Sequence, residues 1–451
     1  MPAHDQSAAR FRYDGYSINP SSGEVSCTYS TGGHSFTERY DFDPAGDWSN
    51  PAAEAAVRIL FLLAGVSYYK TTAAPLIDLG STPTSADERA FLTRFYAGGL
   101  AEFAYRNHLD LSGLSVVGPE SEAAPALGYA PSAGRPLVPF GGGIDSIVTV
   151  AGLQAEGADA TLFVVSPPGD RFAAIEDVAA VTGLPVVHVS REIDPLVRRS
   201  AELGFLNGHV PITAVITASA LVAAVLGGHD AVVLSNEWSA SKPTLMHEGR
   251  PVNHQWSKSA AFEEDFGRLV TRTLGEGVAV FSYLRPRSEL WVAQQFAALR
   301  QFHGVFRSCN RAFTQDPAQR LDHWCGVCDK CCFIDLILAP FMDAAELRAV
   351  FDGREPLENP ALAPRFGTLL GLAPETKPFE CVGDVGECRA AILLAAARPD
   401  RAQTELLQTL REDVSGTPTT SPSAPAELLV PIGPHAIPDR YAPPDLLVRA
   451  H

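Results

Sequence analysis

The heptapeptide FGGGIDS, residues Phe140 to Ser146, follows the apolar stretch Pro136–Pro139 and precedes a helical pattern that starts near Ile147. Consecutive glycines between a strand and a helix let backbone N–H groups turn toward one point and bind an anion. The partial positive charge at the start of the helix adds to this attraction. The stretch therefore predicts a phosphate-binding loop; the alternative is a glycine-rich turn without a ligand.

This loop is not a Walker A motif, because no Gly-Lys-Ser/Thr follows it, and its adjacent glycines do not fit a Rossmann fingerprint. It resembles the Ser-Gly-Gly-x-Asp-Ser loop of enzymes that cleave ATP to AMP and pyrophosphate. We expect ATP to be bound by Gly141, Gly142, Gly143, Asp145 and Ser146, with Asp145 holding magnesium or orienting the pyrophosphate. Gly141 replaces the first serine of the resembled loop, so one hydroxyl contact to phosphate is lost.

Composition and charge limit the class of protein. A chain of 451 residues with 46% hydrophobic residues predicts two or three domains. The polar start Met1–Arg12 lacks the apolar segment of a signal peptide, and no apolar run is long enough to span a membrane, so we expect a cytoplasmic protein without membrane contact. The net charge of −17 disfavours a nucleic-acid partner, although a local basic patch would still permit one.

The first 130 residues are predicted to form an α+β domain. Residues 11–43 alternate polar and apolar side chains around two glycine-containing turns, which indicates two or three antiparallel strands. Helices are expected at 52–66, where Pro51 stands at the start, and at 86–108 with a break near Gly98.

Residues 131–340 alternate strands with helices, a pattern typical of a doubly wound parallel sheet. The loop points to the PP-loop, or adenine-nucleotide alpha-hydrolase, type of α/β fold, whose ligands bind at the carboxyl ends of the strands. Residues 341–412 are predicted to form a C-terminal helical region. Residues 413–451 are rich in Pro and Ser, and we expect this tail to be mobile in part.

Four cysteines are candidates for a structural zinc site: Cys309, Cys325, Cys328 and Cys331. The last three are separated by two residues each, which brings thiolates together on a tight turn, and four thiolates with no open position suit structural zinc. Buried free cysteines are the alternative, and Cys332 is a possible substitute ligand.

Further polar residues are candidates for binding an anionic substrate. Arg285 and Arg287 flank a proline and could bind a carboxylate or phosphate with forked hydrogen bonds, or they could be surface arginines. Asn253 lies in a polar loop with interleaved aromatic residues, and Lys70 follows the first predicted helix. The alternative for Lys70 is an exposed helix end.

Five segments together resemble the MurL family, the ATP-dependent UDP-N-acetylmuramoyl-L-alanyl-L-glutamate epimerases of peptidoglycan synthesis. The segments are Gly65–Lys70, Gly141–Ser146, Val252–Ser259, the cysteine cluster and Lys377–Gly383. The cysteine cluster after the loop also resembles 7-cyano-7-deazaguanine synthase, but that enzyme lacks a long N-terminal domain.

The resemblance to MurL implies that ATP adenylates the α-carboxylate of the terminal L-Glu and that a base and an acid then exchange the Cα proton. Water releases AMP and the D-Glu product, a UDP-N-acetylmuramoyl dipeptide, and the ligase that adds L-Glu would supply the substrate. The acid/base pair is expected among Glu237, His254, Lys258 and Cys381. A deazaguanine-type adenylating enzyme, an amidotransferase-like ligase and a non-catalytic nucleotide-binding protein remain as alternatives.

Overall fold

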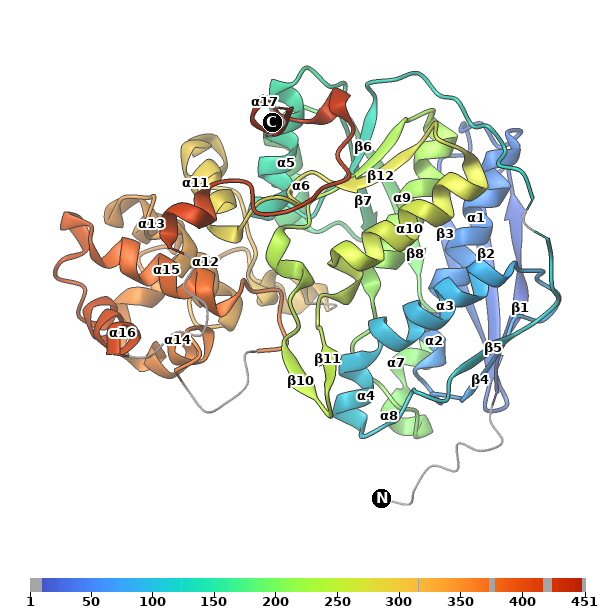
Figure 1. The fold of residues 1–451 in the computed structure, drawn as a ribbon, viewed down its shortest axis with the longest axis horizontal. Helices are drawn as coiled ribbons and strands as arrows, with labels where there is room; N and C mark the ends of the chain where they lie inside the picture. Colours follow the sequence, from blue (N-terminus) through green and yellow to red (C-terminus); the bar gives the residue numbers. More distant parts are fainter. Residues whose placement is uncertain (1–9, 123, 315, 373–377, 417–423, 448–451) are drawn as a thin grey trace.

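The backbone of the fold is a ten-stranded sheet (Figure 1). The structure is a computed structural model that describes residues 10–122, 124–314, 316–372, 378–416 and 424–447. The strands of this sheet are β1 (Arg10–Asn19), β2 (Glu24–Thr31), β3 (His34–Asp41), β4 (Leu76–Asp78), β5 (Ser115–Val117), β6 (Pro136–Pro139), β7 (Thr161–Ser166), β8 (Val186–Glu192), β9 (Ala231–Leu234) and β12 (Ala279–Ser282).

The strand order is β12-β9-β6-β7-β8-β3-β2-β1-β4-β5, and the first five strands in this order pair in parallel. The chain winds from β6 through β7 to β8 on one side and from β9 to β12 on the other. The winding direction therefore reverses between β6 and β9. Every residue of β9 is buried, as expected for a parallel strand covered on both faces. The predicted parallel α/β sheet is confirmed, with the addition of β12, which the sequence pattern did not indicate.

The N-terminal strands extend the same sheet. β1, β2 and β3 are antiparallel, as predicted, and inward and outward residues alternate along β2. Asp41 of β3 pairs with Ser190 of β8 in an antiparallel register, so the strands of the first 130 residues are hydrogen-bonded directly to the parallel part. The domain boundaries proposed near 130, 340 and 412 stay predictions.

Helices cover both faces of the parallel part. One face packs against α9 (Ile212–Gly227) and α10 (Ala260–Leu274). On the same side, α1 (Pro51–Ala64) and α3 (Ala86–Gly99) contact the N-terminal strands β1, β2 and β5. The other packs against α5 (Ile144–Ala155), α6 (Ala173–Thr182) and α11 (Glu289–Ala298). Local sequence sets the helix starts: the Asn50 side chain accepts a hydrogen bond from the Ala52 N–H with Pro51 in the first turn, and Ser85 and Glu88 form a capping box.

Short elements complete the chain. Short α-helices and a hairpin connect the larger elements: α2 (Val66–Tyr69), α4 (Ala101–Asn107), α7 (Pro195–Arg198), α8 (Ser200–Leu203), the hairpin β10 (Leu245–His247) and β11 (Arg250–Val252), and α17 (Pro444–Leu447). The predicted break in the second helical stretch is confirmed, since α3 ends at Gly99 and α4 begins at Ala101.

The C-terminal helices form a separate group beside the sheet (Figure 1). They are α12 (Asp329–Leu338), α13 (Ala344–Val350), α14 (Ala363–Leu369), α15 (Val385–Ala396) and α16 (Glu405–Gly416). The described part of the tail, residues 424–447, returns to the sheet, where the Tyr441 hydroxyl donates to Asp230 at 2.6 Å and Arg440 pairs with the same carboxylate. These contacts hold the described part of the tail to the sheet, and mobility in part of the tail stays a prediction.

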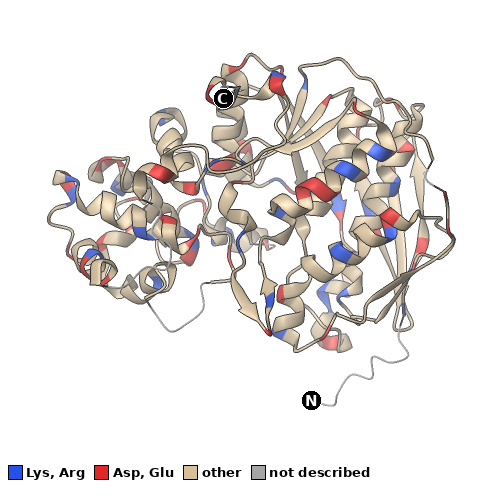
Figure 2. Cartoon of the chain, viewed as in Figure 1, with Lys and Arg blue, Asp and Glu red and all other residues tan. Residues whose placement is uncertain are grey.

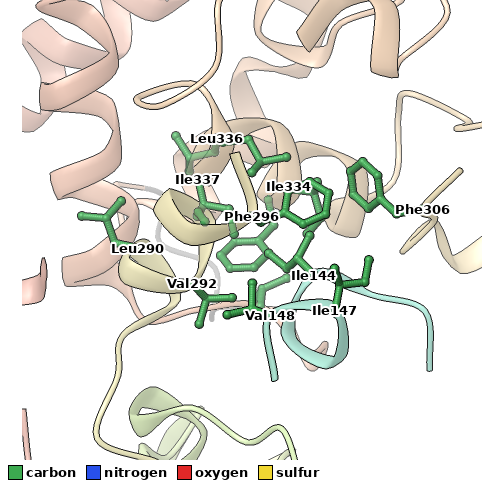
Figure 3. Packing of buried hydrophobic residues seen from close by; sticks show 14 of the residues in the cluster. Ile144, Ile147, Val148, Leu290, Val292, Phe296, Phe306, Ile334, Leu336 and Ile337 are labelled. Carbon is green, nitrogen blue, oxygen red and sulfur yellow. The ribbon is translucent and has the colours of Figure 1, made fainter. Parts of the chain in front are cut away.

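The start of α5 is anchored in a dense apolar core. Figure 3 shows Ile144 and Val148 of α5 facing Val292 and Phe296 of α11, with Ile334 of α12 beyond them. These side chains are almost fully buried. Because α5 begins directly after the glycine loop, this packing fixes the loop relative to the C-terminal helices.

Charged residues are interspersed along the helices (Figure 2). On α10, for example, three acids precede two arginines, and Arg268 contacts both Glu264 and Asp265 one turn before it. Among the described residues, one helical stretch, Pro51–Tyr69, is long and apolar enough to cross a bilayer, but 83% of its apolar window is buried inside the fold, as in a core helix.

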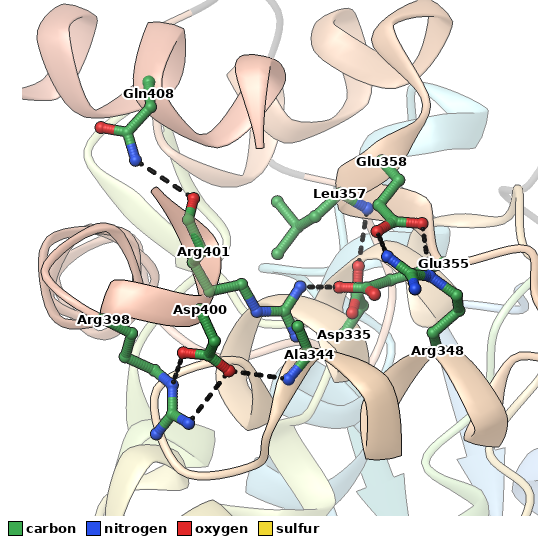
Figure 4. Close-up of polar contacts among 10 residues, drawn as sticks. All are labelled: Asp335, Ala344, Arg348, Glu355, Leu357, Glu358, Arg398, Asp400, Arg401 and Gln408. Carbon is green, nitrogen blue, oxygen red and sulfur yellow. Dashed lines mark hydrogen bonds and ion pairs between the residues drawn. The ribbon is translucent and has the colours of Figure 1, made fainter. Parts of the chain in front are cut away.

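A buried charge network holds the C-terminal helices together (Figure 4). Arg401 is fully buried and pairs with Glu355, while Asp335 accepts a hydrogen bond from the Leu357 N–H at 2.7 Å. Burial raises the pKa of both carboxyl groups, and for Asp335 the neighbouring Glu355 raises it further. The positive charge of Arg401 thus offsets part of the energetic cost of burying the carboxyl groups of Glu355 and Asp335.

Replacing Arg401 should therefore destabilise the protein. We expect Arg401→Met to lower the free energy of unfolding by about 3–5 kcal/mol, because Glu355 would remain buried without its partner. Urea unfolding measures the change. Arg398→Met is the matched control: Arg398 pairs with Asp343 and Asp400 at the surface, so its loss should cost about 1 kcal/mol or less. Equal losses in the two variants would contradict a special role for the buried pair.

Candidate active site

A cavity of about 400 Å³ lies at the carboxyl ends of β6, β7 and β9, where the winding direction reverses. This is the position at which open parallel sheets bind ligands. Its wall contains Gly141, Gly143, Asp145 and Ser146 of the glycine loop. Residues distant in sequence complete it: Thr213, Asn236, Lys258, Arg307, Ser308, Lys330 and Cys381.

The glycine loop has the geometry that its sequence predicts. Gly142 has φ +71°, and a Cβ there would lie 2.7 Å from the Ala174 carbonyl oxygen, so glycine is required on both grounds. Gly143 is the N-cap of α5, and the Ser146 hydroxyl donates to its carbonyl at 2.9 Å. Space around Gly141 is open, since no atom lies within 4 Å of an added Cβ. The start of α5 thus borders a cavity in which an anion would meet the positive end of the helix.

Three carboxylates converge behind the loop. Oxygens of Asp145, Glu237 and Glu289 lie within 4.8 Å of one another. Burial and the nearby Glu237 raise the pKa of Asp145 to about 6, against the opposing effect of two lysines. Burial, Asp145 and Glu237 raise the pKa of Glu289. One oxygen of Asp145 is buried with no hydrogen-bond partner among the described residues. Clustered buried carboxylates with a free oxygen fit a hard divalent cation such as Mg²⁺.

Cys381 lies on the cavity wall between cations. The Lys258 ammonium donates to its sulfur at 3.3 Å, and Lys330 donates to its backbone carbonyl. Burial raises the pKa of the Cys381 thiol, but Lys258 and a hydrogen bond from His254 lower it more, to about 6. Cys381 is therefore a thiolate at neutral pH. Of the predicted segment 377–383, Lys377 lies outside the described residues.

His254 connects this thiolate to a carboxylate. Its Nδ1 lies 2.5 Å from an oxygen of Glu102, and its ring lies 4.2 Å from the ring of His209. Burial lowers the pKa of His254, but hydrogen bonds with Cys381 and Glu102 raise it to about 9, so the imidazole is protonated. Burial and this neighbouring charge hold the pKa of His209 at about 4. Cys381, His254 and Glu102 thus form a thiolate, imidazolium and carboxylate in series.

The guanidinium groups of both candidate arginines bind other groups of the protein. Arg285 is buried, pairs with Glu263 at 2.7 Å, and donates to the carbonyl oxygens of Glu237 and Lys258. Arg287 is buried, pairs with Asp445 of the tail and stacks over a tryptophan ring. Neither guanidinium is a surface group, and neither residue is part of the cavity wall. Their role in substrate binding stays a prediction.

Asn253 and Lys70 also make internal contacts. Asn253 donates to the Ala240 carbonyl and accepts from the Gln255 N–H, which fixes the loop before His254. Lys70 donates to the Gly208 carbonyl, next to His209, and burial lowers its pKa to about 8. Lys70 therefore lies on the His209 side of the site, and substrate contact remains a prediction for both residues.

The four predicted zinc ligands converge. The sulfurs of Cys309, Cys325, Cys328 and Cys331 lie within 4.8 Å of one another. The Cys331 sulfur is 3.4 Å from that of Cys328 and 3.7 Å from that of Cys325. Four thiolates about 2.3 Å from zinc in a tetrahedron would have sulfurs about 3.8 Å apart. Gly326 turns the knuckle with φ +69°. The donor set fits structural zinc.

Several residues of the site were not predicted, among them Thr213, Arg307 and Ser308 of the cavity wall. Glu289, Lys330, Glu102 and His209 are ordinary residues on helices or loops, and they reach the site through tertiary contacts. A sequence signal existed only for Lys330, which stands inside the cysteine cluster. Its position there could have linked the zinc knuckle to the cavity.

Comparison with known proteins identifies relatives across nearly the whole chain. The family model described as the MurL N-terminal domain matches residues 3–283, and the MurL C-terminal domain matches residues 305–424. No solved structure matches.

Three relatives carry the name UDP-N-acetyl-alpha-D-muramoyl-L-alanyl-L-glutamate epimerase. The protein of Xanthomonas oryzae pv. oryzae is 40% identical over 366 residues, 80% of this chain and 79% of its own length. That of Salinispora tropica is 36% identical over 441 residues, 96% of this chain and 94% of its own. That of a Micromonospora species is 35% identical over 442 residues, 96% of each chain.

Metal analysis tests the cysteine cluster. Protein purified without chelator should contain about one zinc per chain, and Cys328→Ser should lose the metal and melt at a lower temperature, because metal binding contributes to folding. Cys332→Ala is the matched control, since Cys332 is buried beside the cluster but is not one of the four converging sulfurs. Full zinc content in Cys328→Ser would contradict the assignment.

Alkylation tests the ionisation of Cys381. Only the thiolate reacts with iodoacetamide, so the rate at this residue should rise through pH 6 and level off above about pH 7, rather than near the ordinary thiol value of about 8.5. Lys258→Met removes the nearest cation and should move the midpoint upward by about one unit or more. Lys242→Met should leave it unchanged, because Lys242 pairs with Asp384. A wild-type midpoint near 8.5, read by peptide mass spectrometry, would refute the thiolate.

Proposed function

The chain belongs to the MurL family, and on this basis we propose that it is an ATP-dependent epimerase acting on the terminal glutamate of UDP-N-acetylmuramoyl-L-Ala-L-Glu in peptidoglycan synthesis. L-Glu would become D-Glu, with release of AMP and pyrophosphate. The reaction that must precede it is the addition of L-Glu to UDP-N-acetylmuramoyl-L-Ala, so the proposal links this enzyme to that ligase.

The main support for the ATP dependence is that the glycine loop, Asp145 and two lysines line a single cavity. Glu237 and Glu289 lie directly behind it, with oxygens within 4.8 Å of an Asp145 oxygen. The loop and the start of α5 would bind the phosphates, as positive helix ends do. Lys258 and Lys330 would neutralise the charge that develops when the substrate carboxylate attacks the α-phosphorus. Asp145, Glu237 and Glu289 would hold Mg²⁺, which draws electron density from the pyrophosphate leaving group.

The missing serine of the loop has a replacement close by. Gly141 lacks a hydroxyl, but a Cβ on Gly143 would lie 3.2 Å from the Ser308 hydroxyl, which also borders the cavity. Arg307 lies beside it on the same wall. We assign Ser308 as the phosphate contact that compensates for the shortened loop, since the Arg307 guanidinium already donates to the carbonyl oxygens of Phe306 and Asp322.

Activation of the carboxylate is required by the chemistry of the Cα proton. Removing that proton beside a free carboxylate would place a second negative charge on adjacent atoms. An acyl adenylate has no such charge, so its Cα proton is more acidic. His254, Lys258 and Cys381 lie together where protons could be taken and returned, whereas Glu237 belongs to the carboxylate cluster.

Loss of Asp145 should stop the first step. We expect Asp145→Asn to reduce pyrophosphate and AMP formation by about 100-fold or more, because the variant loses a charge from the cation site while keeping the side-chain size. Asp177→Asn on the exposed side of α6 is the control and should behave as wild type. Both products are measured with the dipeptide substrate, ATP and Mg²⁺. Unchanged AMP formation in Asp145→Asn would exclude this loop as the ATP site.

Proton exchange tests the second step. In deuterated water the wild-type product should carry deuterium at the glutamate Cα, because inversion passes through a deprotonated carbon. Mass spectrometry of the isolated product reads the label. Inversion without label from solvent would contradict a route through an exchangeable acid/base group.

A further inference from the structure

We propose that Cys381 attacks the acyl adenylate and carries the glutamyl group as a thioester, and that the Cα proton is exchanged on this thioester. The inference rests on the proposed adenylation and concerns the fate of the acyl adenylate. It differs from the acid/base role expected for Cys381 from the sequence.

Cys381 lies at the place where the acyl adenylate would form. Cys381 and Asp145 border the same cavity, so an acyl phosphate formed at the glycine loop would lie beside this sulfur. The other described cysteines lie elsewhere: Cys27 is buried in β2, Cys388 is buried in α15, and five stand in or next to the zinc knuckle. Among the described cysteines, Cys381 is thus the one that borders the cavity of the loop.

The surroundings of the sulfur stabilise an anion. Lys258 donates to it at 3.3 Å, and His254, itself held by Glu102 at 2.5 Å, donates from another side. A nucleophile, a base partner and a carboxylate that orients the base form the arrangement typical of an activated thiol. Because two cations contact the sulfur, it is charged at neutral pH without a separate deprotonation step.

Magnitudes favour attack on the carbonyl over removal of a carbon-bound proton. The pKa of Cys381 falls from 9.0 to about 6, so its affinity for a proton falls by roughly 1000-fold. Nucleophilicity falls far less, by roughly 20-fold for a Brønsted slope of about 0.45. Proton removal from a weak carbon acid is strongly endergonic. Its rate therefore decreases almost in proportion to the basicity of the group that removes the proton. The same contacts therefore weaken Cys381 as a base much more than as a nucleophile.

The step balances. The thiolate attacks the acyl carbon, a C–S bond forms, the C–O bond to AMP breaks, and the electron pair leaves with AMP. The negative charge moves from sulfur to AMP, which removes one of the two anions that hold the His254 proton, and the imidazolium releases this proton to water. The neutral imidazole can then accept the Cα proton of the thioester while Lys258 donates a proton to the opposite face of Cα, and proton transfer from the imidazolium restores the Lys258 ammonium. Water finally cleaves the thioester to the free carboxylate, the Cys381 thiolate and two protons, one of which returns to His254. The sum is ATP, water and the L-Glu compound to AMP, pyrophosphate and the D-Glu compound.

The experiment separates three events in wild type, Cys381→Ala and Cys381→Ser. Exchange of labelled pyrophosphate into ATP, dependent on the dipeptide substrate, reports adenylation. AMP release reports consumption of the adenylate, and deuterium at Cα reports proton exchange. Zinc content and melting temperature confirm that both variants are folded. If wild type shows no substrate-dependent pyrophosphate exchange, the proposed function itself fails.

With a thioester, both variants should keep pyrophosphate exchange within about threefold of wild type, while AMP release and deuterium incorporation fall together by about 100-fold or more. If Cys381 were only the base, AMP release would persist and deuterium incorporation alone would disappear, which would overturn the proposal. Loss of pyrophosphate exchange in folded variants would also overturn it, because the thiol would then be required for adenylation.

Acid-quenched wild-type protein provides a direct check. A mass increase equal to the substrate less water, located on the peptide that contains Cys381 and removed by neutral hydroxylamine, supports the thioester. The same increase on Lys258, resistant to hydroxylamine, would assign the acyl group to an amide and overturn the proposal.

Discussion

The buried ion pair between Arg285 and Glu263 determines the geometry of the candidate site. Through the same guanidinium, Arg285 donates to the carbonyl oxygens of Glu237 and Lys258. It thereby joins α10, the loop after β9 and the loop that carries His254. These contacts place an acid of the carboxylate cluster and the lysine beside the thiolate on one rigid support. An arginine suits this role because its planar fork offers several donors in fixed directions.

Electrostatic balance explains why so many charges can be buried together. Asp145, Glu237 and Glu289 repel one another, while Lys258 and Lys330 lower the energy of the cluster without pairing fully with it. The thiolate of Cys381 adds a further negative charge beside the same two lysines. Such an arrangement is poorly satisfied without ligands, and it matches a substrate that brings phosphates together with a divalent cation. Perturbed pKa values are therefore found where bond making is proposed, but also in the Arg401 network, whose residues are comparably buried and do not line the cavity.

Local patterns made much of the architecture predictable. Ala231–Leu234 is a continuous apolar run, and FGGGIDS combines a strand end with a helix start, so both were recognisable without tertiary information. The zinc ligands were equally local, since three of them lie within seven residues. β4, β5 and β12 were not indicated, because three or four residues are too few to show periodicity.

The acid/base region was predictable only as a set of loops. Glu102 lies 152 positions from His254, and Lys258 lies 123 positions from Cys381, so only the folded chain shows which candidates meet. The assignment of Arg285 to substrate was natural for a loop beside a proline. Its complete burial was not visible in the sequence, because the partner Glu263 lies on a helix whose exposed face is rich in charge.

The return of the tail to Asp230 has a consequence for the cohesion of the sheet. Asp230 immediately precedes β9, is 2% exposed, and accepts hydrogen bonds from the Gly134 and Arg135 N–H groups before β6. One carboxylate therefore joins the starts of two neighbouring parallel strands, and Arg440 of the tail supplies its positive charge. Without that arginine a carboxylate that is almost fully buried would lack a cation, which is costly. The tail thus acts as a clasp that holds β6 and β9 together on the side of the sheet opposite the cavity.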